Sequence, residues 1–134
     1  MAGTLSIQAQ QRIRTLGELL DRVHRVHGLV EQYATTKDNP QLYEVPIRRG
    51  FEQLKLQFTG AGLDALAQQA GSMVLAVRRG GSMVNRARTL REGVGSIRFQ
   101  LELEQRSVAS EDLARQEKAA AEEAASSGEA PGEP

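Results

Sequence analysis

Apolar residues recur at intervals of three and four along most of this chain, which is the spacing of an amphipathic α-helix. The first such segment predicts a helix from about Ser6 to Ala34, with Ser6 as its N-cap. Its apolar positions are Ile13, Leu16, Leu20, Val23, His27 and Val30, widened by Leu19, Val26 and Tyr33. The polar segment from Thr35 to Pro40 reads as a turn, because Asn and Asp bond their own backbone and proline disfavours helix before it.

Two shorter helices follow on the same spacing. Pro46 fits the first turn of the second helix, where its missing N–H is not needed, and the glycine-rich segment 59–62 ends that helix. The third helix is expected from about Leu63 to Arg78, and the pair at 80–81 stops it in the manner of a glycine C-cap. Each carries one apolar stripe, so each is expected to bury a single face.

A fourth helix begins near Ser82 and keeps a seven-residue apolar repeat. The repeat consists of Ala87, Val94, Leu101 and Val108 on one line and Met83, Leu90 and Ile97 on the other. Such a repeat is the seam of a helix that packs on its neighbours at a shallow angle. Gly93 and Gly95 each cost about 1 kcal/mol inside a helix. They indicate a kink or the close approach of another backbone.

The fold class predicted from these segments is all-α: a four-helix bundle, mostly up-down. The bundle domain is expected to span residues 1–109. The repeat weakens at Glu104, and residues 110–134 form an acidic tail rich in Ala and Glu, partly helical and then disordered from Ser126 onward. Because the tail has no apolar stripe, we expect it to contribute little to folding.

Composition removes several classes of chemistry. The chain has no cysteine, which excludes disulfides, thiol catalysis and cysteine-bound zinc. The N-terminus shows no signal peptide and no apolar run approaches the length of a membrane span, so we expect a cytoplasmic protein without a membrane partner. His24 and His27 are one turn apart but lack further ligands, and no catalytic set is recognisable. We therefore expect no enzyme, no metal and no cofactor.

Charge is unevenly distributed along a formally neutral chain. Residues 48–98 carry nine Lys or Arg against three Asp or Glu, whereas residues 99–134 carry three against nine. The candidate partner-binding residues are Arg78, Arg79, Arg88, Arg91 and Arg98. An ordinary solvated face explains such a set without any function. The functional interpretation is a surface for an acidic protein partner, ahead of nucleic acid, because aromatic stacking platforms are missing.

The segment from Phe51 to Leu66 resembles the signature of histidine-containing phosphotransfer domains, which are four-helix bundles. Leu54, Lys55, Gly62 and Leu66 match its residue types and spacing. The position of the phosphoryl-accepting histidine holds Glu52, and Leu56 replaces a small residue. The resemblance implies the scaffold and a surface for receiver-type domains, without phosphotransfer.

Three functions therefore remain open on the sequence. The first is a non-enzymatic interaction or regulatory module that docks an acidic protein through its basic face. The second is a helical structural subunit of a larger complex, one that could contain nucleic acid. The third is a phosphorelay protein of the phosphotransfer type, using an unexpected histidine. Self-association is compatible with all three.

Overall fold

The computed structural model describes residues 4–79 and 81–128, and within them the chain is all-α with no strand. The elements are α1 (Ile7–Thr35), the 3-10 turn η1 (Pro40–Tyr43), α2 (Glu44–Gly60), α3 (Asp64–Arg78) and α4 (Met83–Gly128). The predicted four-helix, all-α fold is therefore confirmed.

Helix starts follow the expected capping chemistry. The hydroxyl of Ser6 accepts a hydrogen bond from the backbone N–H of Ala9 at 3.1 Å, so Ser6 is the N-cap of α1. Ser82 caps α4 in the same way, through the N–H of Asn85 at 3.1 Å. The second helix begins at Glu44, two residues before Pro46, because η1 leads directly into it.

The conformation of the turn between α2 and α3 explains why position 62 is a glycine. Gly62 has φ of +76°, a left-handed conformation that favours glycine. The N–H of Leu63 donates to the carbonyl of Phe58 at 2.8 Å, and the N–H of Gly62 donates to that of Thr59 at 3.1 Å. This pair of bonds is a Schellman motif, which closes the helix and reverses the chain.

The end of α3 differs from the expected glycine cap. Arg79 is the C-cap residue and its backbone is extended, with φ −69° and ψ 138°, so the chain leaves the helix before the glycines. Gly81 has a positive φ of 121°. Gly80 lies outside the described residues.

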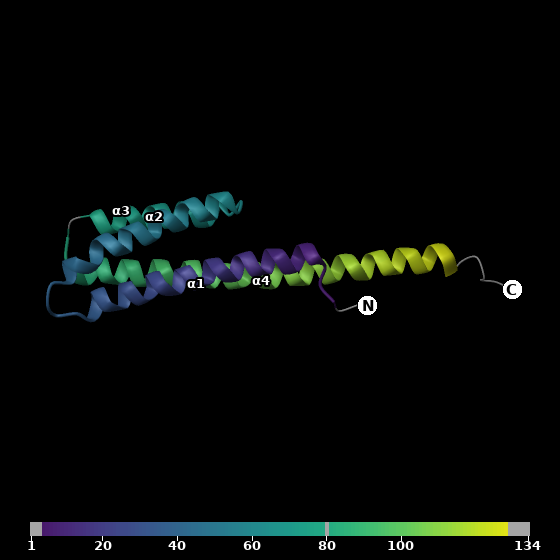
Figure 1. The fold of residues 1–134 in the computed structure, drawn as a ribbon, viewed down its shortest axis with the longest axis horizontal. Helices are drawn as coiled ribbons and strands as arrows, with labels where there is room; N and C mark the ends of the chain where they lie inside the picture. The colour runs from purple at the N-terminus through teal and green to yellow at the C-terminus, as the bar shows by residue number, and fades with distance from the viewer. Residues whose placement is uncertain (1–3, 80, 129–134) are drawn as a thin grey trace.

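The four helices form two layers of unequal length. Helices α1 and α4 run side by side as a long antiparallel pair, and the hairpin of α2 and α3 covers one end of that pair (Figure 1). Each helix contacts its neighbours in the order α1, α2, α3, α4 and back to α1. The α1–α4 pair therefore extends beyond the hairpin as a two-helix shaft.

The core lies where all four helices meet. It is mostly aliphatic, and its largest fully buried side chains include Tyr33, Phe51 and Phe58. Gly50 of α2 lies against Val26 of α1, and a Cβ added at Gly50 would come within 2.7 Å of Val26 Cγ2. The glycine thus allows α1 and α2 to approach closely.

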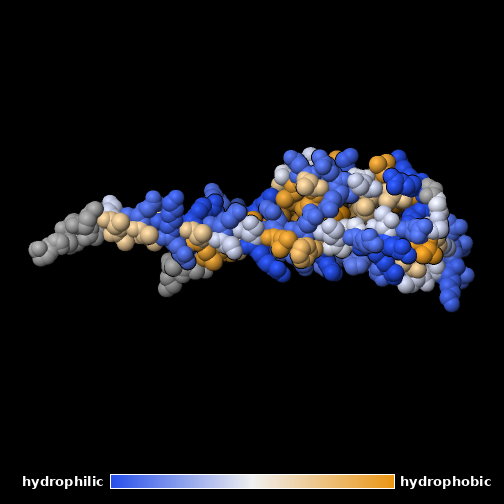
Figure 2. Space-filling model, turned by 180° about the vertical axis from the view of Figure 1, so that it is seen from behind, coloured by the Kyte–Doolittle hydropathy of each residue, from blue (hydrophilic) through white to orange (hydrophobic). Residues whose placement is uncertain are grey.

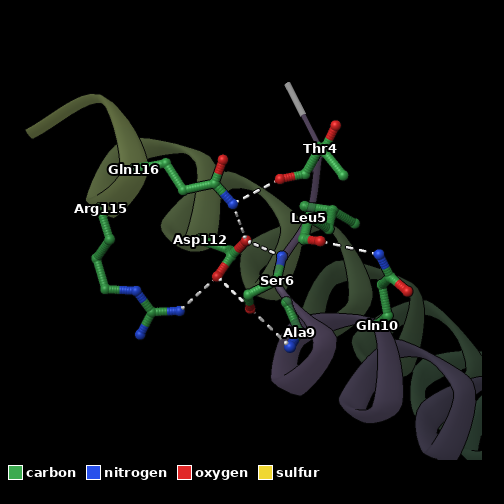
Figure 3. Close-up of polar contacts among 8 residues, drawn as sticks. All are labelled: Thr4, Leu5, Ser6, Ala9, Gln10, Asp112, Arg115 and Gln116. Carbon is green, nitrogen blue, oxygen red and sulfur yellow. Dashed lines mark hydrogen bonds and ion pairs between the residues drawn. The ribbon is translucent and has the colours of Figure 1, made fainter. Parts of the chain in front are cut away.

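The boundary expected at residue 110 is not an interruption of the helix. Helix α4 continues to Gly128, so residues 126–128 are helical rather than disordered, and residues 129–134 lie outside the described part. Asp112 is only 3% exposed. Its carboxylate accepts hydrogen bonds from the backbone N–H and the hydroxyl of Ser6, at 2.8 and 2.7 Å (Figure 3).

Further polar contacts join this part of α4 to the start of α1. Gln116 donates to Asp112 at 2.8 Å and to the carbonyl of Thr4 at 2.6 Å, and Arg115 donates to Asp112 at 3.1 Å (Figure 3). The expectation that the tail contributes little to folding did not include this network, because the contacts of α4 with the start of α1 are polar there rather than apolar. None of the described helices combines the length and the hydrophobicity needed to cross a bilayer.

Candidate functional site

Several arginines line a pocket at the end of the bundle where α2 begins, α3 ends and α4 begins. Its volume is about 290 Å³. The lining residues are Arg48, Arg78, Arg79 and Arg86, with Glu44, Val45 and Val77. We call this the arginine pocket. Four guanidinium groups thus share one concavity with a single carboxylate.

Arg86 holds the wall of the arginine pocket together. One terminal nitrogen donates to the hydroxyl of Tyr33 at 3.1 Å and to the carboxylate of Glu44 at 2.8 Å. The other donates to the backbone carbonyl of Arg79 at 2.9 Å. Because these partners belong to α1, α2 and the α3–α4 connection, one side chain links three parts of the chain.

The electrostatics of this network follow from burial and pairing. Burial raises the pKa of Tyr33, which the neighbouring Arg86 opposes. The hydrogen bond to Tyr33, together with the charge of Glu44, raises the pKa of Arg86 above its ordinary value. The Nε–H of Arg86 is buried and has no hydrogen-bond partner among the described residues. Arg86 is therefore a permanently charged group whose buried Nε–H is unused.

The other arginines of the pocket are paired less closely with carboxylates than Arg86 is. The carboxylate of Glu44 is occupied by Arg86 and by the hydroxyl of Tyr33 at 3.3 Å. Arg48 lies 4.0 Å from Glu52, at the limit of an ion pair. Arg78 and Arg79 are exposed and form no ion pair within residues 4–79 and 81–128. The pocket consequently has an excess of positive charge.

The other three candidates from the sequence lie elsewhere. Arg88 and Arg91 line a second concavity with Ala34, Met83, Val84, Ala87 and Glu92. Arg91 binds Glu31 through two nitrogens, at 2.8 and 3.0 Å. That pairing lowers the pKa of Glu31. Arg98 is half-buried further along α4 and lines neither concavity. The predicted basic face is thus divided into separate groups.

The acidic segment of the same chain does not cover the arginine pocket. The yellow end of α4 extends away from the bundle, whereas the α3–α4 connection lies at the opposite end of the molecule (Figure 1). The described acidic residues of this segment therefore cannot neutralise Arg78 and Arg79 of their own chain. Residues of the acidic tail up to 128 therefore leave the arginine pocket uncovered.

Other positions singled out in the sequence can also be placed. His24 is exposed, and Nε2 of His27 lies 3.8 Å from the carboxylate of Glu31. Across the described ranges, no three His, Cys, Asp or Glu side chains cluster in a way that could hold a metal ion. Lys55, which matches the phosphotransfer signature, and Glu52, which occupies the position of its histidine, line an open groove between α2 and α3 together with Leu56.

Sequence reasoning did not assign Arg48 and Arg86 to the site, nor Tyr33 and Glu44 to its wall. The only available signal was that Arg86 falls one residue before the seam position Ala87, so it lies at the edge of the buried face. Searches against protein-family models, curated proteins and solved structures find no match to this chain.

Proposed function

We propose that this protein is a non-enzymatic helical interaction module that docks an acidic protein partner at the arginine pocket. The observation that carries the proposal is the convergence of four arginines on one concavity whose single carboxylate is already paired. Carboxylates are natural ligands of guanidinium groups, because the planar donors can form two parallel hydrogen bonds.

The lining of the arginine pocket favours a protein partner. Val45 and Val77 provide apolar surface beside the arginines, which suits the methylene groups of Glu or Asp side chains. Tyr33 is fully buried and engaged with Arg86, so it offers no ring face to a base. Stacking on aromatic rings is the usual means of binding single-stranded nucleic acid.

Fluorescence anisotropy with a labelled, glutamate-rich peptide tests the proposal. The wild-type chain should bind the peptide, and added salt should weaken the binding. Reversal of Arg78 and Arg79 to Glu should weaken it about tenfold or more, since tenfold corresponds to about 1.4 kcal/mol and attraction becomes repulsion. The matched control is reversal of Arg14 and Arg22, which are also exposed but lie outside the pocket.

The structure also selects which arginines to change. Reversing Arg88, Arg91 and Arg98 together would remove the ion pair between Arg91 and Glu31, so any loss of binding would be confounded with local structure. The proposal is wrong if the Arg78/Arg79 variant binds the peptide as well as the control does. It is replaced by the nucleic-acid alternative if a single-stranded oligonucleotide of equal charge binds more tightly, with a steep dependence on salt.

A further inference from the structure

Two large apolar side chains lie in solvent on α4, near the point where the bundle gives way to the shaft. Phe99 is 57% exposed and Leu103 is 43% exposed. Each is two residues from the fully buried Leu101, which places it about 200° around the helix from the core. Helix α4 contacts α1 and α3, and both side chains nevertheless remain exposed to solvent. In space-filling representation, a hydrophobic patch interrupts the hydrophilic surface along the shaft (Figure 2).

Gly95 lies one turn before Phe99 and has no role inside the chain. Glycine inside a helix is destabilising unless something requires it. At Gly93 an added Cβ would displace the side chain of Met73, so this glycine has a contact inside the chain. At Gly95 an added Cβ would meet nothing within 4 Å. A second backbone approaching from outside would account for this glycine.

The distribution of charge along α4 indicates which chain could approach this surface. From residue 83 to 98, α4 carries four arginines against one acid, and from 99 to 128 it carries seven acids against three basic residues. A second copy of α4 in antiparallel orientation would bring each basic half against an acidic half. A parallel copy would bring like charges together, which is unfavourable.

The outward strip of α4 is also symmetric in its spacing. Its residues are Arg88, Gly95, Phe99, Arg106, Ser110 and Glu117, separated by seven, four, seven, four and seven residues. These steps keep all six on one face, because seven plus four residues is about three turns. The series of spacings is the same when it is counted from either end, and Leu103 lies beside its midpoint. A two-fold axis at that midpoint would place each residue of the strip opposite a complementary residue of a second copy.

We propose that this strip is an isologous interface, through which two copies of the chain pair by antiparallel contact of their α4 helices. Arg88 of one copy faces Glu117 of the other, and Phe99 faces Arg106, whose guanidinium can stack on the ring. Gly95 faces Ser110, so small residues permit close approach on both sides of Leu103. Such self-complementarity is what a two-fold dimer requires. The interface does not involve Arg78 or Arg79, so it is independent of the acidic-partner proposal.

Light scattering on the full chain at low ionic strength measures the association. The expected mass is twice that of the 14.6 kDa chain. Replacement of Phe99 and Leu103 by Ser should give the monomer mass with unchanged helical circular dichroism. The matched control is replacement of Leu56 and Leu75 by Ser, which are also exposed but lie on α2 and α3. A monomer for the wild type, or loss of the dimer in the control instead, would overturn the proposal.

A charge exchange tests the antiparallel register itself. Arg88→Glu alone and Glu117→Arg alone should each weaken the dimer, because each places like charges opposite one another twice. An equimolar mixture of the two variants should restore it, because in the mixed pair both facing positions again carry opposite charges. The double variant should also dimerise. If the mixture stays as monomeric as its components, the register is wrong.

Discussion

Asp112 shows how one side chain can join segments that are distant in sequence. It lies in the acidic part of α4, yet it is buried and bonded to the residue that caps α1. Hydrogen bonds from the backbone and the hydroxyl of Ser6 lower the pKa of Asp112 below its ordinary value of 3.8. The charged form of the carboxylate is therefore the one that stabilises the folded chain.

Asp112→Asn should lower the melting temperature at neutral pH, since the amide cannot accept all the bonds that the carboxylate accepts. Because the pKa is lower in the folded state, the contribution of the carboxylate is fully present above its ordinary pKa and is lost as the pH falls from that value through the lower pKa of the folded state. The difference in melting temperature between wild type and variant should thus be constant from pH 8 to about 5 and should shrink below about pH 4. Thermal melts followed by circular dichroism measure it.

The control is Glu117→Gln, which removes a charge of the same sign from an exposed position. It should leave the melting temperature nearly unchanged when the chain is dilute enough to be monomeric. If Asp112→Asn melts like this control at neutral pH, the bonds to Ser6 make no net contribution to stability.

Arg86 is a second residue whose role follows from its place in the fold rather than from its charge alone. Two of its partners, Tyr33 and Glu44, precede it by 53 and 42 residues, and they meet Arg86 only because the helix ends converge. It is counted among the basic residues of the chain, but it acts as the scaffold on which the exposed Arg78 and Arg79 are presented. A guanidinium suits this role because its five donors are fixed in one plane.

At the scale of the helices, the close approach of α1 and α2 depends on a glycine. Gly50→Ala should lower the free energy of unfolding, because its Cβ would press on Val26, a buried β-branched side chain with little rotamer freedom. Overpacking of this kind costs about 1–3 kcal/mol. Chemical denaturation measures the change.

Gly28→Ala in α1 is the matched substitution without the contact. A Cβ at Gly28 meets nothing within 4 Å. Alanine should therefore raise the free energy of unfolding by about 0.5–1 kcal/mol, because it is the better helix former. If both substitutions change the free energy of unfolding in the same direction, Gly50 has no special role in the packing of α1 on α2.

The apolar stripes of α2 and α4 both belong to the core, and the leucines at their centres are fully buried. Leu54 and Leu101 are 1% and 0% exposed. Truncation of either to Ala should lower the free energy of unfolding by about 2–5 kcal/mol, through lost burial and a residual cavity. Leu56→Ala, on an exposed position of α2, should change it by less than about 0.5 kcal/mol. Equal effects at Leu54 and Leu56 would mean that the face of α2 is assigned incorrectly.

At the scale of the whole molecule, the shaft formed by α1 and α4 is held by few apolar side chains and several polar contacts. Gln105 donates to the carbonyl of Ile13 at 3.3 Å, and Gln116 donates to that of Thr4 at 2.6 Å. These bonds link the ends of α1 and α4 that the α2–α3 hairpin does not cover. The shaft is therefore expected to be less stable than the four-helix part.

Two truncations locate the end of the folded unit. A chain ending at Lys118 keeps Asp112 and Gln116 and loses residues 119–126, which are exposed, so its melting temperature should match the full chain in the monomeric state. A chain ending at Ala109 lacks the bonds to Ser6 and should melt at a lower temperature, still cooperatively because the core is intact. Identical melts for both would restore the earlier expectation that everything after 109 is dispensable to folding.

Local patterning was sufficient for the helices. The spacing of apolar residues, Ser6 and Ser82 at helix starts and Gly62 at a helix end are short-range signals, because capping and amphipathicity involve residues within one or two turns. They predicted four helices and, through their single apolar faces, the all-α bundle. The charge division of α4 is likewise visible in the sequence alone.

Only the tertiary structure decided which polar groups meet. Asp112 with Ser6, Arg86 with Tyr33 and Glu44, and Arg91 with Glu31 are pairs separated by 42 to 106 residues. No local spacing encodes such pairs, because they depend on the alignment of helices that pack antiparallel. That alignment placed Arg78 and Arg79 at the arginine pocket, Arg88 and Arg91 at a second concavity and Arg98 at neither. It also gathered Arg48 and Arg86 into the pocket and left Phe99 in solvent. The sequence determined the helices and their buried faces, whereas helix packing determined the polar contacts and the shape of the surface.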